Sequence, residues 1–213
     1  MKIKVCGLRN PENIKAVAGL SPDYMGFICY EHSSRFISDM PAEVMNDISA
    51  PVYKTGVFVD ETEANINALI GNYGFNTIQL HGKESPEFAN SFRNKVTVIK
   101  AFGLDNDFDF NQLNAYAEKV DYLLFDTKTA IHGGSGKTFN WNVLDKYKLS
   151  VPFFLSGGLS LDNLETIKKI THPQFYGVDL NSRFETAPGM KDIEKLKQAF
   201  NLLKQFTAHE IRS

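Results

Sequence analysis

The chain has 213 residues, of which 43% are hydrophobic and 23% charged, and a formal net charge of -2 at pH 7. These values are typical of globular proteins, and the lack of a basic excess argues against nucleic-acid binding. No apolar run approaches the roughly 20 residues of a membrane span, and no signal-peptide core is visible. Two cysteines form no disulfide framework. We therefore expect a cytoplasmic protein with no nucleic-acid or membrane partner.

Short runs of apolar, β-branched or aromatic residues recur along the whole chain and predict strands. These runs span residues 2–6, 24–30, 52–59, 75–80, 96–102, 121–125, 152–156 and 175–180. Helical spacing appears between them. One helix is expected after Asn10 as N-cap, with Pro11 in its first turn, and another is expected to begin at Asp60 and to end near Gly74. Residues 160–170 and 190–206 also show helical spacing, whereas a helix near 42–48 is weakly indicated.

The alternation of strands and helices predicts a parallel sheet, because parallel strands need crossover connections. Eight such units favour an α/β fold, a closed eight-stranded parallel (β/α)8 TIM barrel, although 213 residues is short for it. An open doubly wound sheet is the competitor, but it usually shows a glycine fingerprint after the first strand. Here the first strand ends in Cys6-Gly7-Leu8-Arg9, which is not that glycine fingerprint. No linker divides the chain, so residues 1–213 are expected to form a single phosphate-binding barrel domain.

The stretch GSGKT, within residues 132–141, resembles half of a P-loop. The first glycine of that motif should fall at position 131, where the chain has Ile131. About ten residues also separate the preceding strand from the next helix, whereas a P-loop joins them directly. An ATPase is therefore disfavoured, which leaves a flexible glycine-rich loop or a mobile loop over an active site.

Reactive residues follow the predicted strands, which is where a (β/α)8 barrel carries its active site. The usual phosphate site lies in the loops after strands seven and eight, here Gly157-Gly158 and Asn181-Ser182. Glycines let backbone amides approach an anion closely. The alternative is that the glycines only turn the chain into a helix capped by Ser160. The position in the barrel favours a phosphorylated small-molecule substrate.

An acid and a base are expected on opposite sides of the barrel mouth. Cys6 ends strand one, and a thiolate favoured by nearby cations is a usable base. Asp126 ends strand six, and a carboxylic acid in a partly dry mouth can donate a proton. The alternatives are a small buried hydrophobe for Cys6 and a helix cap or salt bridge for Asp126. Lys4 shares the inward strand face with Cys6 and needs an anionic partner, either Asp126 or Asp179.

Several stretches, in order and over nearly the whole chain, resemble the phosphoribosylanthranilate isomerase family of tryptophan biosynthesis. They are KVCGLRN (4–10), MGFICYEHSSRFI (25–37), GVFVD (56–60), IQLHG (78–82), LLFDT (123–127), GGSGKTFNW (133–141), FLSGGL (154–159), GVDLNSRFE (177–185) and PGMKD (188–192). Taken together, these motifs are specific, although any one of them alone would be weak.

The resemblance implies an Amadori rearrangement, with Cys6 as general base and Asp126 as general acid. It implies that Arg35 pairs with the anthranilate carboxylate of the substrate, and we include Asp179 among the substrate-binding candidates. The GGSGKT loop would close over the substrate. No His/Asp cluster has metal-ligand spacing, so we expect neither a metal nor a cofactor. The sequence leaves the oligomeric state open, and we favour a monomer.

The chain departs from the family after strand eight, where Asn181-Ser182-Arg183 replaces the usual Ser-Ser-Gly. If the backbone at Arg183 had a positive φ, the arginine would cost on the order of 1 kcal/mol. The side chain could instead reach the phosphate. Cys29, Tyr30 and His32 lie near the same mouth, where we expect them to pack rather than to react.

Two other functions stay open. One is a different phosphate-binding barrel enzyme, such as an epimerase or the two-substrate isomerase of the histidine pathway. The latter type uses carboxylates as both acid and base, which Cys6 argues against. The other is a non-catalytic barrel kept as a binding or scaffold protein, which intact Cys6, Asp126 and Arg35 argue against.

Overall fold

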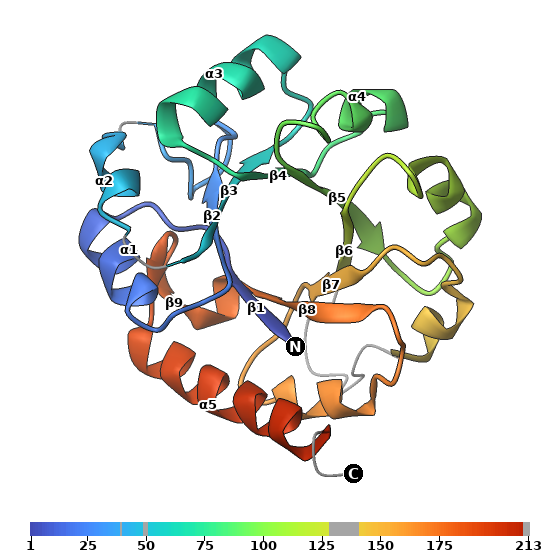
Figure 1. Cartoon of the computed structure of the whole chain (residues 1–213). Helices are drawn as coiled ribbons and strands as arrows, with labels where there is room; N and C mark the ends of the chain where they lie inside the picture. The colour runs from blue at the N-terminus through green and yellow to red at the C-terminus, as the bar shows by residue number, and fades with distance from the viewer. Residues whose placement is uncertain (39, 49–50, 128–140, 211–213) are drawn as a thin grey trace.

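Eight parallel strands close into a barrel in chain order, β1 to β8 (Figure 1). The computed structural model describes residues 1–38, 40–48, 51–127 and 141–210. The strands are β1 (Lys2–Val5), β2 (Tyr24–Ile28), β3 (Tyr53–Phe58), β4 (Thr77–Leu80), β5 (Thr97–Leu104), β6 (Tyr122–Thr127), β7 (Phe153–Ser156) and β8 (Phe175–Leu180). Pairing of β1 with β8, which places Lys4 opposite Asp179, closes the barrel. The predicted fold is confirmed.

Helices surround the barrel and connect successive strands (Figure 1). The α-helices are α1 (Pro11–Ala18), α2 (Glu43–Asn46), α3 (Glu63–Tyr73), α4 (Pro86–Asn90) and α5 (Ile193–Glu210). The 3-10 helices are η1 (Phe110–Tyr116), η2 (Trp141–Lys146), η3 (Leu164–Lys169) and η4 (Ser182–Phe184). The N-cap of α1 is Asn10, as predicted, and α2 is as short as the weak pattern suggested.

Three helix starts differ from the sequence prediction. Helix α3 is capped by Thr62 rather than Asp60, because Asp60 has φ 49° and gives its amide to the Glu84 carboxylate. Helix η3 begins only at Leu164, since the Asn163 side chain bonds the Ser160 amide and the Gly158 carbonyl and holds the chain in a turn.

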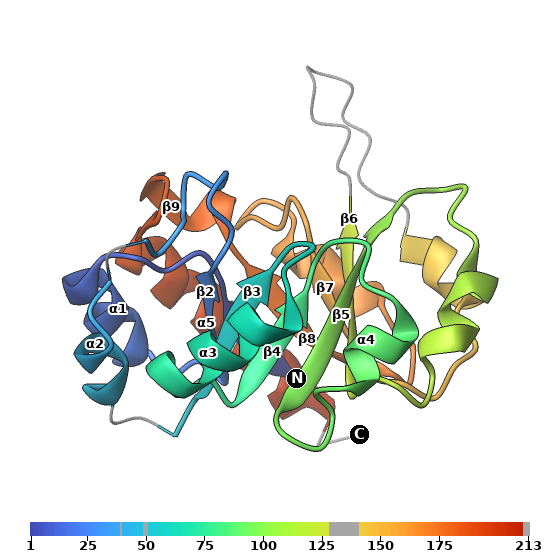
Figure 2. The same ribbon diagram turned by 90° about the horizontal axis from the view of Figure 1, so that it is seen from above.

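The third difference is that α5 begins at Ile193 rather than at residue 190, because an unpredicted hairpin lies between β8 and α5. It consists of β9 (Glu185–Ala187) and β10 (Met190–Lys191), paired antiparallel. Pro188 and Gly189 separate the two strands, and Gly189 has φ 81°, which favours a turn over the expected helix. Figure 2 shows β9 at one end of the barrel and the N-terminus toward the other. The hairpin is therefore placed to contribute to a site at the barrel mouth.

Alternation along the strands separates two kinds of core. Ile3 and Val5 pack in the large cluster between barrel and helices. A smaller cluster consists of Tyr24, Ile99, Ala101, Leu124 and Phe154, which belong to the barrel strands. Lys4 and Asp179 are also buried, and they are paired across β1 and β8. Other buried polar side chains of the barrel strands include Thr55, Thr77, Gln79 and Lys100, so polar groups accompany the apolar cluster and reach the mouth of the barrel. Among the described residues, no helix is long and apolar enough to cross a membrane.

Candidate active site

Cys6 follows β1 at the carboxyl end of the barrel and is 3% exposed. Its backbone amide donates to the Leu180 carbonyl (3.0 Å), which fixes the thiol relative to β8. Lys4 lies on the same strand face, and its Nζ donates to Asp179 Oδ2 at 2.8 Å, with both side chains buried. Of the two partners predicted for Lys4, the structure therefore selects Asp179.

Burial and charge act on the Cys6 thiol in opposite directions. Burial raises the pKa of Cys6, and the nearby Lys4 ammonium opposes this without cancelling it. Lys191, from β10, adds a second cation acting on the same thiol. For Lys4 itself, burial favours the neutral amine, but Asp179 and Cys6 outweigh it and raise the pKa of Lys4. The expected cations are present, yet the thiol holds its proton more tightly than a free cysteine does.

Asp126 lies near the carboxyl end of β6, which is the third strand from β1 around the closed barrel. Its side chain is 40% exposed. Its Oδ2 lies 3.5 Å from Nε2 of His81, a residue that follows β4. The other ring nitrogen of His81, Nδ1, is 2.8 Å from the buried Gln79 side-chain amide. Asp126 is therefore paired with a histidine, the side chain that most readily exchanges a proton near neutral pH.

A buried ion pair holds the backbone on both sides of His81. Lys100 Nζ lies 3.1 Å from Glu84 Oε2 and donates to the carbonyls of Leu80 (3.3 Å) and Gly82 (2.9 Å). Burial lowers the pKa of Lys100, although the neighbouring Glu84 carboxylate acts to raise it. Because a buried ammonium must satisfy its donors within the protein, these bonds restrict the loop that aims His81 at Asp126.

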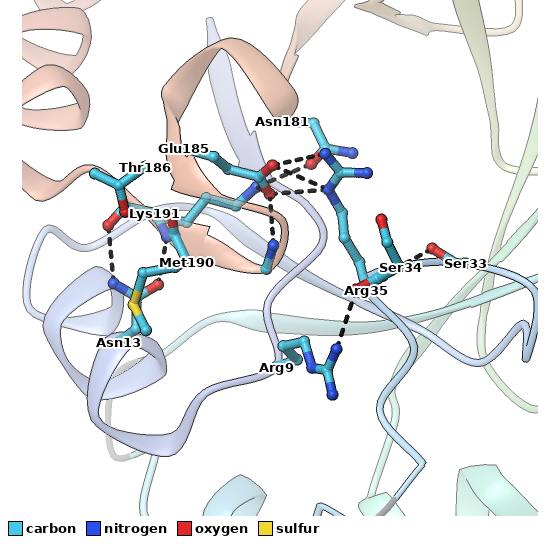
Figure 3. Close-up of polar contacts among 11 residues, drawn as sticks. Arg9, Asn13, Ser33, Ser34, Arg35, Asn181, Glu185, Thr186, Met190 and Lys191 are labelled. Carbon is cyan, nitrogen blue, oxygen red and sulfur yellow. Dashed lines mark hydrogen bonds and ion pairs between the residues drawn. The ribbon is translucent and has the colours of Figure 1, made fainter.

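Arg35 lies in the loop after β2 and is clamped by Glu185 from β9 (Figure 3). Its Nη2 lies 2.6 Å from Glu185 Oε2, and its Nε lies 2.9 Å from Oε1 and 3.1 Å from Oε2. Lys191 Nζ bonds Glu185 Oε1 at 2.6 Å and Asn181 Oδ1 at 2.9 Å. This cluster of two cations and one carboxylate borders Cys6, which contributes to the pKa values of both Arg35 and Lys191.

The predicted phosphate loops lie side by side after β7 and β8. Gly157 (φ 84°) and Gly158 (φ 60°) both have left-handed backbone conformations, which suit glycine. Asn163, not Ser160, takes the N-cap position of η3. Ser182 begins η4, whereas the Asn181 side-chain oxygen is already bonded to Lys191. An amide oxygen accepts hydrogen bonds and cannot donate to an anion, so the donors for a phosphate here would be the N–H groups of the backbone and of the Asn181 side chain.

Arg183 is exposed on η4, and among the described residues no hydrogen bond or ion pair involves its side chain. Its φ is not positive, so the backbone strain considered for this position is absent. The arginine is tolerated because the chain here needs no glycine.

The remaining sequence predictions concern the GGSGKT loop and the residues around Cys29. The GGSGKT loop lies in 128–140, outside the described residues. Cys29 is buried, and burial raises its pKa to about 12. The His32 ring packs edge-on against the Tyr30 ring, with 5.2 Å between the ring centroids, although the His32 side chain is 71% exposed. The sequence reading assigned no role to His81, Glu185 or Lys191, although the motifs IQLHG, GVDLNSRFE and PGMKD contain them.

Among the described residues, no group of three His, Cys, Asp or Glu side chains could hold a metal ion. Thiol, carboxylate and arginine side chains instead gather at the carboxyl ends of parallel strands closed into a barrel. That arrangement defines the class of (β/α)8-barrel enzymes, whose active sites occupy this end.

Comparisons with known proteins identify the family within that class. Residues 3–202 match the family model described as N-(5'phosphoribosyl)anthranilate (PRA) isomerase. An N-(5'-phosphoribosyl)anthranilate isomerase of Parabacteroides distasonis is 45% identical over 200 residues, which cover 92% of this chain and 90% of the relative. One from Phocaeicola vulgatus is 42% identical, covering 96% and 98% of the two chains. The chain belongs to the phosphoribosylanthranilate isomerase family, which acts in tryptophan biosynthesis.

Solved structures agree in fold as well as sequence. The phosphoribosyl anthranilate isomerase of Thermus thermophilus superposes with a TM-score of 0.82 at 28% identity, covering 96% of this chain and 99% of its own. The Thermotoga maritima enzyme gives 0.81 at 33% identity, covering 94% and 96%. Another similar structure, 28% identical with a TM-score of 0.79, is a complex with reduced 1-(o-carboxyphenylamino)-1-deoxyribulose 5-phosphate, and covers 94% of this chain and 96% of its own.

Proposed function

We propose that this protein catalyses the Amadori rearrangement of N-(5'-phosphoribosyl)anthranilate to 1-(2-carboxyphenylamino)-1-deoxyribulose 5-phosphate by general acid–base catalysis. The observation that carries the proposal is the placement of Cys6 directly after β1 and of Asp126 on β6, across the barrel mouth, each beside a group that can assist it. Neither a metal nor a cofactor takes part.

Asp126 acts first, as the acid. It donates its proton to the ring oxygen of the ribose, the bond from that oxygen to C1′ breaks, and the anthranilate nitrogen lone pair forms a protonated Schiff base. His81, 3.5 Å from Asp126, can return a proton to the carboxylate. The partly exposed carboxyl thus does not depend on bulk solvent alone for its proton.

Cys6 acts second, as the base. Its thiolate removes the proton from C2′, and the electron pair left behind forms the C1′–C2′ double bond of a neutral enolamine. The hydroxyl proton at C2′ then moves to C1′ as the enolamine tautomerises to the ketone. One proton enters from Asp126 and one leaves to Cys6, so the isomerisation is balanced. Lys4 and Lys191 stabilise the thiolate electrostatically.

Anion recognition divides between two ends of the site. The 5′-phosphate binds the backbone amides of Gly157, Gly158 and Ser182, at the usual phosphate position of these barrels. The substrate carboxylate binds Arg35, whose planar fork suits it. Asp179 has one buried oxygen, Oδ1, without a partner among the described residues, which is available to a substrate hydroxyl.

Arg35→Ala should raise KM with little change in kcat, because the ion pair forms equally in ground and transition states. A charge-assisted bond contributes roughly 1.5–3 kcal/mol, so KM should rise about 10- to 100-fold. Steady-state kinetics check this, with Arg93→Ala, an arginine paired with Asp121, as the matched control. An unchanged KM would place the carboxylate elsewhere.

Arg183→Gly should leave affinity for the reduced product analogue within about twofold, roughly 0.4 kcal/mol, because the exposed side chain is not needed for the phosphate. The fold should lose at most about 1 kcal/mol, since a glycine adds backbone freedom where φ is not positive. Titration and thermal unfolding measure both quantities. A tenfold weaker affinity would show that Arg183 contacts the phosphate directly.

We propose a monomer in the cytoplasm. Among the described residues, the large hydrophobic side chains that stand exposed are Tyr53 and Met190, too few for an extended apolar interface. Both cysteines are free, as in a reducing compartment.

One similar solved structure is of monomers generated from the dimeric Thermotoga maritima enzyme, so members of the family can exist as monomers or as dimers. Light scattering at micromolar concentration tests the proposed state.

A host lacking phosphoribosylanthranilate isomerase tests the proposed function in cells. Expression of this chain should restore growth without tryptophan, and expression of Asp126→Asn at an equal level should not. Failure of the wild-type chain to restore growth, when it is present as folded protein, would reject the function.

A further inference from the structure

The guanidinium of Arg35 has two edges that can each hold a carboxylate, and the protein fills one of them. Glu185 contacts Nε and Nη2, the side-on edge (Figure 3). Among the described residues, no hydrogen bond involves Nη1, so the end-on edge formed by Nη1 and Nη2 keeps free donors. The side chain of Arg35 is 21% exposed, whereas that of Glu185 is 4% exposed. The open edge therefore belongs to Arg35, the member of the pair that is more exposed to solvent.

Glu185 is itself held from several directions. Besides Arg35, its Oε1 accepts from Lys191 Nζ at 2.6 Å and from the Gly189 amide at 3.2 Å. Burial raises the pKa of Glu185, but the bonds from Arg35 and Lys191 outweigh it, so the pKa is lowered and the group is a carboxylate. A carboxylate fixed in this way is a rigid support for the arginine rather than a mobile surface partner.

Lys191 is anchored as firmly as the carboxylate it holds. Its amide donates to Asn13 Oδ1 (2.7 Å), and its carbonyl accepts from Asn13 Nδ2 (2.9 Å). The α1 helix thereby fixes the hairpin strand that carries Lys191. Charges within the cluster add to +1, from Arg35, Lys191 and Glu185, so the cluster still attracts an anion.

The opposite side of Arg35 is packed against the chain after Cys6. Gly7 has φ 79°, and a Cβ there would lie 2.6 Å from Arg35 Cδ and 2.7 Å from Asn181 Oδ1. The aliphatic part of the arginine thus lies directly on the Gly7 backbone. Packing on one side and Glu185 on the other leave the guanidinium one orientation, close to Cys6.

We propose that Glu185, held by Lys191, is a positioning residue that occupies the side-on edge of Arg35 and thereby reserves its end-on edge for the carboxylate of the substrate. The inference rests on the proposed function, because that function supplies the carboxylate. It adds a determinant of specificity, since a ligand with a carboxylate would be preferred only while Arg35 is held in this orientation.

Positioning and simple electrostatics predict opposite results for Glu185→Gln. Removing a negative charge beside Arg35 would strengthen carboxylate binding if charge alone mattered, and also if Glu185 competed with the substrate. If Glu185 positions Arg35 through both of its carboxylate oxygens, Glu185→Gln should weaken carboxylate binding instead. A glutamine side chain has a single acceptor oxygen, and its NH2 group would point at the N–H donors of Arg35 or Lys191 without being able to accept from them. The sign of the change therefore decides between the explanations.

The experiment titrates wild type and variants with two probes. One is the reduced product analogue named above, and the other is the same compound without its carboxyl group. In the wild type the carboxylate should improve affinity about 10- to 100-fold, the value of a charge-assisted bond. This ratio should fall to about threefold or less in Glu185→Gln and in Lys191→Met, with affinity for the second probe retained. Glu31→Gln, an exposed carboxylate of the Arg35 loop, should keep the wild-type ratio.

Glu185→Asp covers the case in which Glu185→Gln does not fold. It keeps the charge but shortens the reach, so its ratio should fall as well, and binding of the second probe reports that the protein is folded. An unchanged or larger ratio in a folded Glu185 variant would overturn the inference. A ratio near one in the wild type would instead overturn the carboxylate contact of Arg35 that belongs to the proposed function.

Discussion

Cys6→Ser should lower kcat by about 100-fold or more while the barrel remains folded, as expected for the loss of a positioned general base. A hydroxyl has nearly the size of a thiol but is far less acidic, so it cannot serve as the base near neutral pH. Binding of the reduced product analogue should change little, since the proposed anion contacts lie on other residues. Single-turnover and steady-state measurements separate these effects.

The dependence of kcat/KM on pH provides the control for this assignment. Because burial raises the pKa of Cys6, the thiol is protonated at neutral pH, and the active thiolate accumulates only as the pH rises. Wild-type kcat/KM, which reports on the free enzyme, requires both the Cys6 thiolate and an acid that still carries its proton, so it should follow a bell-shaped pH profile whose alkaline side is set by the raised pKa of Cys6. Cys6→Ser should lack this alkaline side. A folded serine variant with near wild-type kcat, or one with the same pH dependence, would contradict the role of Cys6.

Asp126→Asn should also lower kcat by about 100-fold or more, for a different reason. An amide cannot donate a proton to the ribose oxygen, so ring opening becomes the slow step. The side chain is 40% exposed and keeps its size, so the free energy of unfolding should change little. His81→Asn is the companion variant, and it should lose less activity, because Asp126 can still obtain its proton from water.

Two outcomes would separate Asp126 from its proposed role. One is Asp126→Asn with near wild-type kcat in a protein that unfolds at the wild-type temperature. The other is His81→Asn losing as much activity as Asp126→Asn, which would make the histidine the donor and Asp126 its support.

The barrel and the location of the candidate site could be predicted because each depends on local pattern. Strand runs, their spacing and the inward parity of Lys4 and Cys6 are properties of short segments, and the closed barrel then brings strand ends together. Asn10 as a helix cap and Gly74 as a left-handed helix end are likewise local. Sequence reasoning works where the physical cause lies within a few residues.

The partners of those residues could not be predicted in the same way. Glu185 lies 150 positions from Arg35, and Lys100 reaches carbonyl groups of the preceding strand and loop. Such pairs depend on the register of the barrel and on a hairpin whose pattern reads as helix. His81 belongs to the motif IQLHG, but its contact with Asp126 needs β4 and β6 in place.

The most direct test of the central claim follows the fluorescence of freshly made N-(5'-phosphoribosyl)anthranilate in the presence of a metal chelator and without nucleotide. The wild-type protein should remove the fluorescent substrate with many turnovers per active site. The double variant Cys6→Ser, Asp126→Asn, shown to be folded by its thermal unfolding, should do so no faster than the uncatalysed background. No turnover by the wild type, loss of its activity with the chelator, or undiminished activity of the double variant would contradict the proposed acid–base isomerase.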